Sequence, residues 1–121
     1  MLHAARTYGK VATQVANQRE LEADLLLKAA SRLKAIQDSW DQSKPDLDDA
    51  LLYNRKLWTI FLTSATSSDN PLPTDIRQNV ANLGVFVMNH TLAVMSDPRP
   101  ERLSTLININ RELAAGLRGS A

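Results

Sequence analysis

Apolar residues recur at intervals of three and four along most of the chain, a pattern that predicts amphipathic helices. The first such stripe contains Leu21, Leu25, Ala29, Leu33, Ile36 and Trp40. Asn17 can cap the backbone while Glu20 reaches back from three residues later, as in a capping box. The pattern therefore predicts a helix that begins near Asn17 and packs on one side only.

A second helix is expected to begin around Pro45, because proline is tolerated in a first helical turn. Its apolar stripe contains Leu47, Leu51, Trp58 and Leu62, and it is widened towards the C-terminal end by Leu57, Ile60 and Phe61. Residues 64–70 are small and polar and predict a loop. The wide apolar part of this helix predicts two neighbouring elements.

A third helix is expected from Thr74, after Pro73. One of its stripes contains Ile76, Val80, Leu83, Val87 and Val94, and the other contains Val85, Met88, Leu92 and Met95. The run Val85–Met88 read alone resembles a strand, but its periodic flanks favour a helix. A helix that is apolar on several faces is expected at the centre of the fold.

A fourth helix is expected after Pro100, with Gly116 and Gly119 as its stop signals. Its apolar face contains Leu103, Leu106, Ile107, Asn110, Leu113 and Leu117. Asn110 on this face is either a buried amide that fixes the helix register or a residue at the rim, and the sequence leaves both alternatives open.

Residues 1–16 show a weaker helical pattern, interrupted by Gly9, and we interpret them as a conditional segment that is helical when docked on the core or on a partner. The chain as a whole predicts one all-α domain over residues 1–121. Its expected architecture is a compact bundle of about four helices with short connections.

The composition limits the function classes. Of the 121 residues 44% are hydrophobic and 22% charged, and the 14 basic and 13 acidic residues are interspersed, so no basic stripe for nucleic acid is expected. There is no cysteine for a disulfide or a thiolate nucleophile. No apolar run approaches the ~18 residues that a membrane helix needs, and the first residues lack the apolar core of a signal peptide. A cytoplasmic location is expected.

No catalytic or metal-binding constellation is recognisable. His3 and His90 have no second ligand at helical spacing, and His90 is expected to be a structural or surface histidine on the third helix. The serines lack a neighbouring base, and there is no glycine-rich phosphate loop. An enzyme, a cofactor and a small-molecule substrate are therefore not expected, and the excess of apolar helical surface indicates a binding protein.

The order of the motifs resembles the FlaF family of flagellar biosynthesis regulators over nearly the whole chain, roughly from Ala4 to Leu117. The resemblance is carried by Asn17-Gln18-Arg19-Glu20-Leu21-Glu22, Leu57-Trp58-Thr59-Ile60, Asn70-Pro71-Leu72-Pro73, Leu83-Gly84, Leu106-Ile107-Asn108-Ile109-Asn110-Arg111 and Gly116-Leu117. The family often has proline where this chain has Gln18.

The resemblance implies a small cytoplasmic helical protein that acts on flagellin as an export chaperone and in the control of its synthesis. It also implies a functional link to FlbT, which acts on flagellin expression in the opposite sense. We expect an amphipathic terminal helix of flagellin to dock in an apolar groove. The candidate contacts are Trp58, Phe61, Met88 and Met95, with Leu2, Tyr8 and Val11 from the N-terminal segment, although in sequence a core Trp58 and a contact Trp58 look alike.

Two alternatives remain open at the level of sequence. The chain could regulate translation by binding flagellin messenger RNA, with phosphate contacts from Arg55, Lys56, Arg77, Arg99 and Arg102 and a steep dependence on salt. It could also be a helical adaptor or self-assembling domain whose apolar surface is a homodimer interface.

Overall fold

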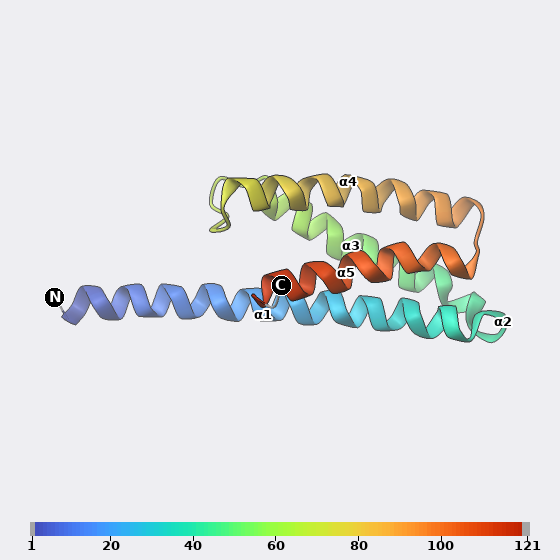
Figure 1. Cartoon of the computed structure of the whole chain (residues 1–121), viewed down its shortest axis with the longest axis horizontal. Coiled ribbons are helices and arrows are strands. Elements are labelled where there is room, and N and C mark those ends of the chain that lie inside the picture. The colour runs from blue at the N-terminus through green and yellow to red at the C-terminus, as the bar shows by residue number, and fades with distance from the viewer. Residues whose placement is uncertain (1, 120–121) are drawn as a thin grey trace.

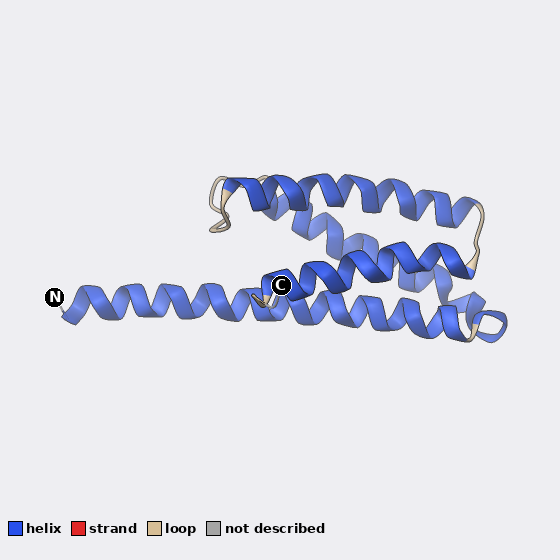
Figure 2. Ribbon diagram, in the orientation of Figure 1, coloured by secondary structure: helices blue, strands red, loops and turns tan. Residues whose placement is uncertain are grey.

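The computed structural model describes residues 2–119, and for residues 2–5, 7, 8 and 11 it describes the backbone only. All regular elements in this range are helical (Figure 2). They are α1 (Leu2–Asp38), α2 (Trp40–Ser43), the 3₁₀ turn η1 (Lys44–Asp46), α3 (Leu47–Ala65), α4 (Thr74–Ser96), the 3₁₀ turn η2 (Pro100–Arg102) and α5 (Leu103–Leu117). The predictions of an all-α fold and of a helix at 85–88 are confirmed.

The four long helices run up and down in sequence order, and each is antiparallel to the next (Figure 1). The most extensive contacts join α1 to α5 and α3 to α4, while α1 also packs on α3 and α4 touches α5 only slightly. The molecule is thus two antiparallel helix pairs packed together, which confirms the expected compact bundle of about four helices.

Prolines set the helix starts where the sequence indicated them. Pro45 lies in the 3₁₀ turn that leads directly into α3, Pro73 precedes the first residue of α4, and Pro100 opens the 3₁₀ turn before α5. At the other end of α5, Gly119 adopts a φ of 76°, which glycine reaches without steric cost. These boundaries follow from local backbone chemistry and confirm the expected starts of the last three long helices.

The expected start of the first helix near Asn17 is wrong. α1 is one continuous helix of 37 residues that begins at Leu2, so Asn17 lies inside it rather than at its N-cap. Residues 2–16 contain no proline, and an interior asparagine or Gly9 costs only about 1 kcal/mol or less relative to alanine. The helix therefore continues through the capping signal, and its N-terminal part projects beyond the rest of the bundle (Figure 1).

The core lies where α1, α3 and α5 meet and includes the buried face of α4. Its completely buried large apolar side chains are Leu26, Leu33, Leu51, Trp58, Val87, Val94, Leu103 and Leu106. On α1, Ala23 and Ala30 are buried as well as Ala29, so this helix is covered by both α5 and α3. The expectation that it packs on one side only is therefore wrong, and Leu21, assigned to its buried stripe, is 58% exposed.

The expectation that the third helix is central is also wrong. α4 lies at the edge of the bundle, against α3 (Figure 1). A Cβ added at Gly84 would come 3.2 Å from Cδ1 of Leu62, so the two helices approach closely at this point. Val80, Val87 and Val94 are buried, whereas the second apolar stripe of α4 remains largely open to solvent because no further helix within residues 2–119 covers it.

A buried polar network joins three helices inside this core. Asn110 of α5 is completely buried, and its Oδ1 accepts a hydrogen bond of 2.9 Å from Nε1 of Trp58. Its Nδ2 donates to Oδ1 of Asn54 at 2.7 Å and to the backbone oxygen of Leu26 at 3.3 Å. Of the two alternatives left open for Asn110, the structure therefore shows the buried amide.

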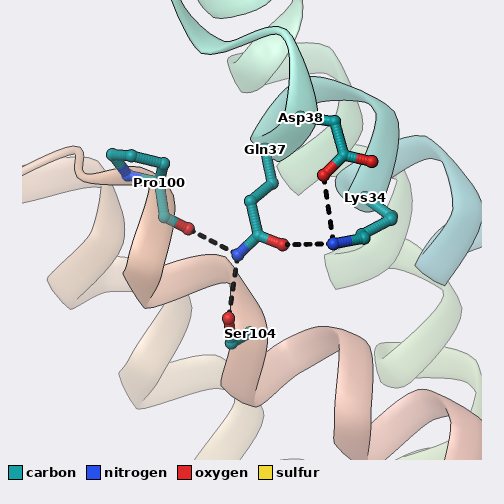
Figure 3. Close-up of polar contacts among 5 residues, drawn as sticks. All are labelled: Lys34, Gln37, Asp38, Pro100 and Ser104. Carbon is teal, nitrogen blue, oxygen red and sulfur yellow. Dashed lines mark hydrogen bonds and ion pairs between the residues drawn. The ribbon is translucent and has the colours of Figure 1, made fainter.

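Polar contacts also fasten both ends of the α1–α5 pair. Nε2 of Gln37 donates to the backbone oxygen of Pro100 and to Oγ of Ser104, each at 2.8 Å (Figure 3). At the other end Arg118 bonds to Glu20 at 2.9 Å and to Asp24. α5 therefore ends alongside Glu20, and the part of α1 before this residue extends beyond its partner helix.

We predict that Asn110→Ala lowers the free energy of unfolding by about 3 kcal/mol. The substitution leaves the Trp58 indole N–H and the Asn54 amide oxygen buried without a partner, and each unpaired group costs about 1–3 kcal/mol. Urea denaturation followed by circular dichroism measures the loss.

Asn108→Ala is the matched control, since Asn108 is exposed on the same helix and the same change there is expected to stay within about 0.5 kcal/mol. Equal losses for the two variants would contradict a special role of the Asn110 network.

A candidate partner-binding groove between α1 and α3

An open apolar groove lies between the middle of α1 and the C-terminal half of α3. Its volume is about 510 Å³. It is lined by Asn17, Gln18, Leu21, Glu22 and Leu25 of α1 and by Leu57, Ile60, Phe61 and Ser64 of α3. The apolar residues form its centre and the polar ones its rim, which is the arrangement typical of protein-binding clefts.

The groove exposes two large apolar side chains above a rigid floor. Leu21 is 58% exposed and Ile60 64% exposed, whereas Leu57 and Phe61 keep only 7% and 6% of their surface. The ring of Phe61 meets that of the buried Trp58 edge to face, with centroids 5.8 Å apart and planes at 86°. Because the floor rests on the core tryptophan, the groove is preformed in the isolated chain.

The loop between α3 and α4 lies beside one end of the groove. Asn70 donates from Nδ2 to Oγ of Ser64 at 3.0 Å, and its Oδ1 accepts from the backbone N–H of Leu72 at 2.9 Å. A small pocket beside the groove is formed by Asn70, Pro71 and Leu72 together with Arg19 and other residues of α1. Asn70 thus holds the proline-containing loop next to α1 at the place where the helix leaves the bundle.

Glu22 is the one titratable group of the groove. Burial raises the pKa of its carboxyl above the ordinary value, against a hydrogen bond from Gln18 and the charge of Arg19, which both lower this pKa. A carboxylate held at the edge of an apolar groove is partly deprived of water even in the isolated chain. A partner that covers the groove would remove more water and raise the pKa further.

The residues of α1 before the groove form an exposed helical arm, defined here as residues 2–16. At 1.5 Å per residue the arm is about 22 Å long. Side chains described within it, such as Lys10 and Thr13, are exposed, and Val15 is partly buried. The helical pattern suspected in residues 1–16 is present as helix from Leu2 onward, while Met1 lies outside the described residues.

The structure places the seven candidate contact residues in different parts of the molecule. Trp58 is completely buried, so the surface does not offer it to a partner, and Phe61 belongs to the groove floor. Met88 is partly buried and Met95 is 47% exposed, both on α4 rather than at the groove. Leu2, Tyr8 and Val11 have their backbone in the arm, and their side chains lie outside the described part of the structure.

Two groove residues were missed as contacts by sequence reasoning. Leu21 was assigned to the core stripe of the first helix, and Ile60 was noted only as widening the second helix. The available signal for Ile60 was its position two residues after Trp58, which places it about 200° around the helix from a buried side chain. No comparable signal marks Leu21, because its exposure depends on where α5 ends.

The basic residues of the RNA alternative do not form one surface. Nε of Arg77 donates to the backbone oxygen of Ala65 at 3.0 Å and so satisfies a carbonyl at the end of α3. Arg99 and Arg102 pair with Asp97 at 2.9 and 3.3 Å. Arg77 lies in the first turn of α4 and Arg99 after its end, and the helix between Arg77 and Ser96 is about 28 Å long.

Other polar features have local structural partners. His90 is partly buried, its ring stacks on Phe86, and its Nε2 donates to the backbone oxygen of Arg102 at 2.9 Å. Among the side chains that the structure describes, no group of three or more His, Asp or Glu residues is placed to hold a metal ion. Nor does the described part of the chain contain a helix long and apolar enough to cross a membrane.

Comparison with known protein families finds a match over most of the chain. The model of the family described as Flagellar protein FlaF matches residues 4–117. No curated protein and no solved structure matches the chain.

We predict that Glu22→Gln stabilises the chain at pH 7 by less than about 1 kcal/mol and has no such effect at pH 3.5. Because the pKa of Glu22 is raised in the folded state, its contribution favours folding below the unfolded pKa of about 4.3 and is lost as pH rises through the folded pKa. Urea denaturation at the two pH values measures the difference.

Glu112→Gln, at an exposed position of α5, is the control and is expected to change stability little at either pH. A gain for Glu22→Gln of the same size at both pH values would show that ionisation of Glu22 is not its cause.

Proposed function

The chain belongs to the FlaF family of flagellar proteins, and from this we propose that it binds flagellin in the cytoplasm as an export chaperone and supports regulated flagellin synthesis. The observation that supports binding is the preformed apolar groove between α1 and α3. In this proposal the groove holds an amphipathic terminal helix of flagellin until export, and FlbT is the functional counterpart that acts on flagellin expression in the opposite sense.

The shape of the groove suits a helix. Its lining extends from Asn17 to Leu25 on α1 and from Leu57 to Ser64 on α3, so each wall is about two helical turns long. A docked helix would present apolar residues at intervals of three and four to Leu21 and Ile60, which stand on the opposite walls. The polar rim would meet the polar flanks of that helix.

Such a groove would serve a chaperone because the apolar stripes of the flagellin helices need to be shielded before export. Terminal helices of flagellin are amphipathic and would otherwise self-associate through their apolar stripes. Burying one large aliphatic side chain contributes about 1.5–3 kcal/mol, so a few contacts in a rigid groove give useful affinity without the permanence of an obligate interface. The partner can then be released for export.

The arm could extend the flagellin-binding surface beyond the groove along α1. Tyr8, Val11 and Val15 follow one another at intervals of three and four, and the same spacing leads on to Gln18 and Glu22 of the groove. These positions therefore share one side of α1. A flagellin helix longer than the groove would lie along them, whereas Leu2 does not share this spacing.

The RNA and self-assembly alternatives remain distinguishable by experiment. An RNA-binding regulator would lose affinity steeply with salt, because each neutralised phosphate contributes to the salt dependence. The internal pairing of Arg77, Arg99 and Arg102 favours the protein-binding proposal.

We predict that Ile60→Glu weakens flagellin binding by about 10- to 100-fold while the bundle stays folded. Ile60 is 64% exposed in the free chain, so its replacement costs little stability, but a docked helix would bury the new carboxylate. The measurement is calorimetric titration of the chain with monomeric flagellin at two salt concentrations.

Thr63→Glu is the matched control, because it adds the same charge at an exposed position of α3 outside the groove. Flagellin lacking its terminal helices should not bind. Binding that survives Ile60→Glu unchanged, or that needs no terminal helix, would overturn the groove proposal, and a strong salt dependence with messenger RNA in place of flagellin would favour the RNA alternative.

We predict further that the double variant Tyr8→Ala, Val11→Ala weakens flagellin binding by several-fold without lowering the melting temperature. The arm lies beyond the bundle, so the core does not depend on it (Figure 1), whereas a long docked helix would contact these positions. Thr13→Ala, on the opposite side of the arm, is the control. Unchanged affinity of the double variant for flagellin would show that flagellin docks in the groove and not along the arm.

A further inference from the structure

The open stripe of α4 has the spacing of a coiled-coil seam. It consists of Ala81, Val85, Met88, Leu92 and Met95, which follow one another at intervals of four, three, four and three residues. We call these five residues the α4 seam. Val85, Leu92 and Met95 are 54%, 55% and 47% exposed, and Ala81 and Met88 are partly buried. This spacing keeps apolar residues facing one partner helix over several turns.

α4 itself carries no charged residue along the seam, and a charge that touches this helix from outside is Arg102, whose Nη1 donates to the backbone oxygen of Ala93 at 3.2 Å. From Gln78 to Ser96, α4 contains no aspartate, glutamate, lysine or arginine. Such a long uncharged segment is unusual for an exposed helix, and depletion of charged residues marks the core of protein interfaces. The outer flank of the seam instead carries Asn82, Asn89 and Ser96, all exposed.

From these features we propose that the α4 seam pairs with the α4 seam of a second copy of this chain, in antiparallel orientation about a two-fold axis. The argument for a second copy is self-complementarity. A two-fold interface brings one surface against itself, so a charged flank would have to match its own copy, whereas a neutral flank has no such conflict. Asparagine side chains both donate and accept, so two of them can bond to each other.

The spacing of the seam accommodates this antiparallel register. With Val85 opposite the partner's Met95 and Met88 opposite the partner's Leu92, large side chains alternate along the seam, and Ala81 falls at its end. On the outer flank this register places Asn89 beside its own copy and Asn82 beside the partner's Ser96. The α1–α3 groove contains no residue of α4, so the pairing surface and the groove share no residue.

The first test is the oligomeric state of the full chain. Sedimentation equilibrium should show a concentration-dependent species of twice the 13.4 kDa of one chain. Leu92→Glu should weaken this association by at least about 100-fold, because it places two carboxylates in the apolar seam. Ala93→Glu, which adds the same charge to α4 outside the seam, should leave the association unchanged.

Cysteine cross-linking tests the orientation in this cysteine-free chain. With a short bis-maleimide, Asn89→Cys should yield covalent dimers, whereas Asn82→Cys should not, because the two copies of residue 82 would lie about 21 Å apart, fourteen residues along the helix. A mixture of Asn82→Cys and Ser96→Cys chains should cross-link. Efficient dimers from Asn82→Cys alone would overturn the antiparallel register.

A chain that stays monomeric at high micromolar concentration, or that dimerises equally well as Leu92→Glu, would overturn the proposal. Flagellin titration of the Leu92→Glu variant separates this inference from the proposed function, because the groove should still bind. If the unsubstituted chain is monomeric and Leu92→Glu abolishes flagellin binding, the seam is a surface for flagellin and not for a second copy.

Discussion

The hydrogen bonds of Asn110 constrain the rest of the bundle. One buried amide joins the indole of Trp58, the side chain of Asn54 and the backbone of Leu26, and so ties α5 to both α3 and α1. Apolar contacts tolerate small rotations of a helix, but these three hydrogen bonds do not, because any rotation leaves a buried polar group unpaired. Among the residues that the structure describes, none bonds to the buried Nδ2 of Asn54, so the network has no spare acceptor with which to compensate for a shift.

The rotation of α3 that this network fixes decides which apolar residues reach the surface. With Trp58 turned into the core, Leu57 and Ile60 face the side of α1, while Leu62 meets Gly84 of α4 on the other side. The groove and the α4 seam therefore lie on opposite sides of the same helix. Both apolar surfaces remain exposed because α5 ends alongside Glu20 of α1 and because no other helix within residues 2–119 covers this face of α4.

Helix starts that depend on local backbone chemistry could be predicted from the sequence. Which helix faces other helices bury could not. Proline positions and apolar periodicity predicted the starts of α3, α4 and α5, since these depend on neighbouring residues alone. The predicted start of α1 was wrong because the capping pattern at Asn17 lies inside a continuous helix that no proline interrupts. The exposure of Leu21 and the edge position of α4 were not predicted, for another reason. An apolar stripe on a helix shows that the stripe needs a packing partner, but it does not show whether another part of the same chain is that partner.

The two surfaces differ in a way that matches different partners. The groove has mixed polar edges, including the partly buried carboxyl of Glu22, which suits a partner with a distinct flank, whereas the neutral seam suits its own copy. In the proposed dimer the two-fold axis would bring two grooves into one particle. A flagellin that engages both grooves through its two terminal helices would bind the second at high effective concentration, so modest grooves would retain it firmly. Loss of either contact would then allow stepwise release, as the proposed role in export would require.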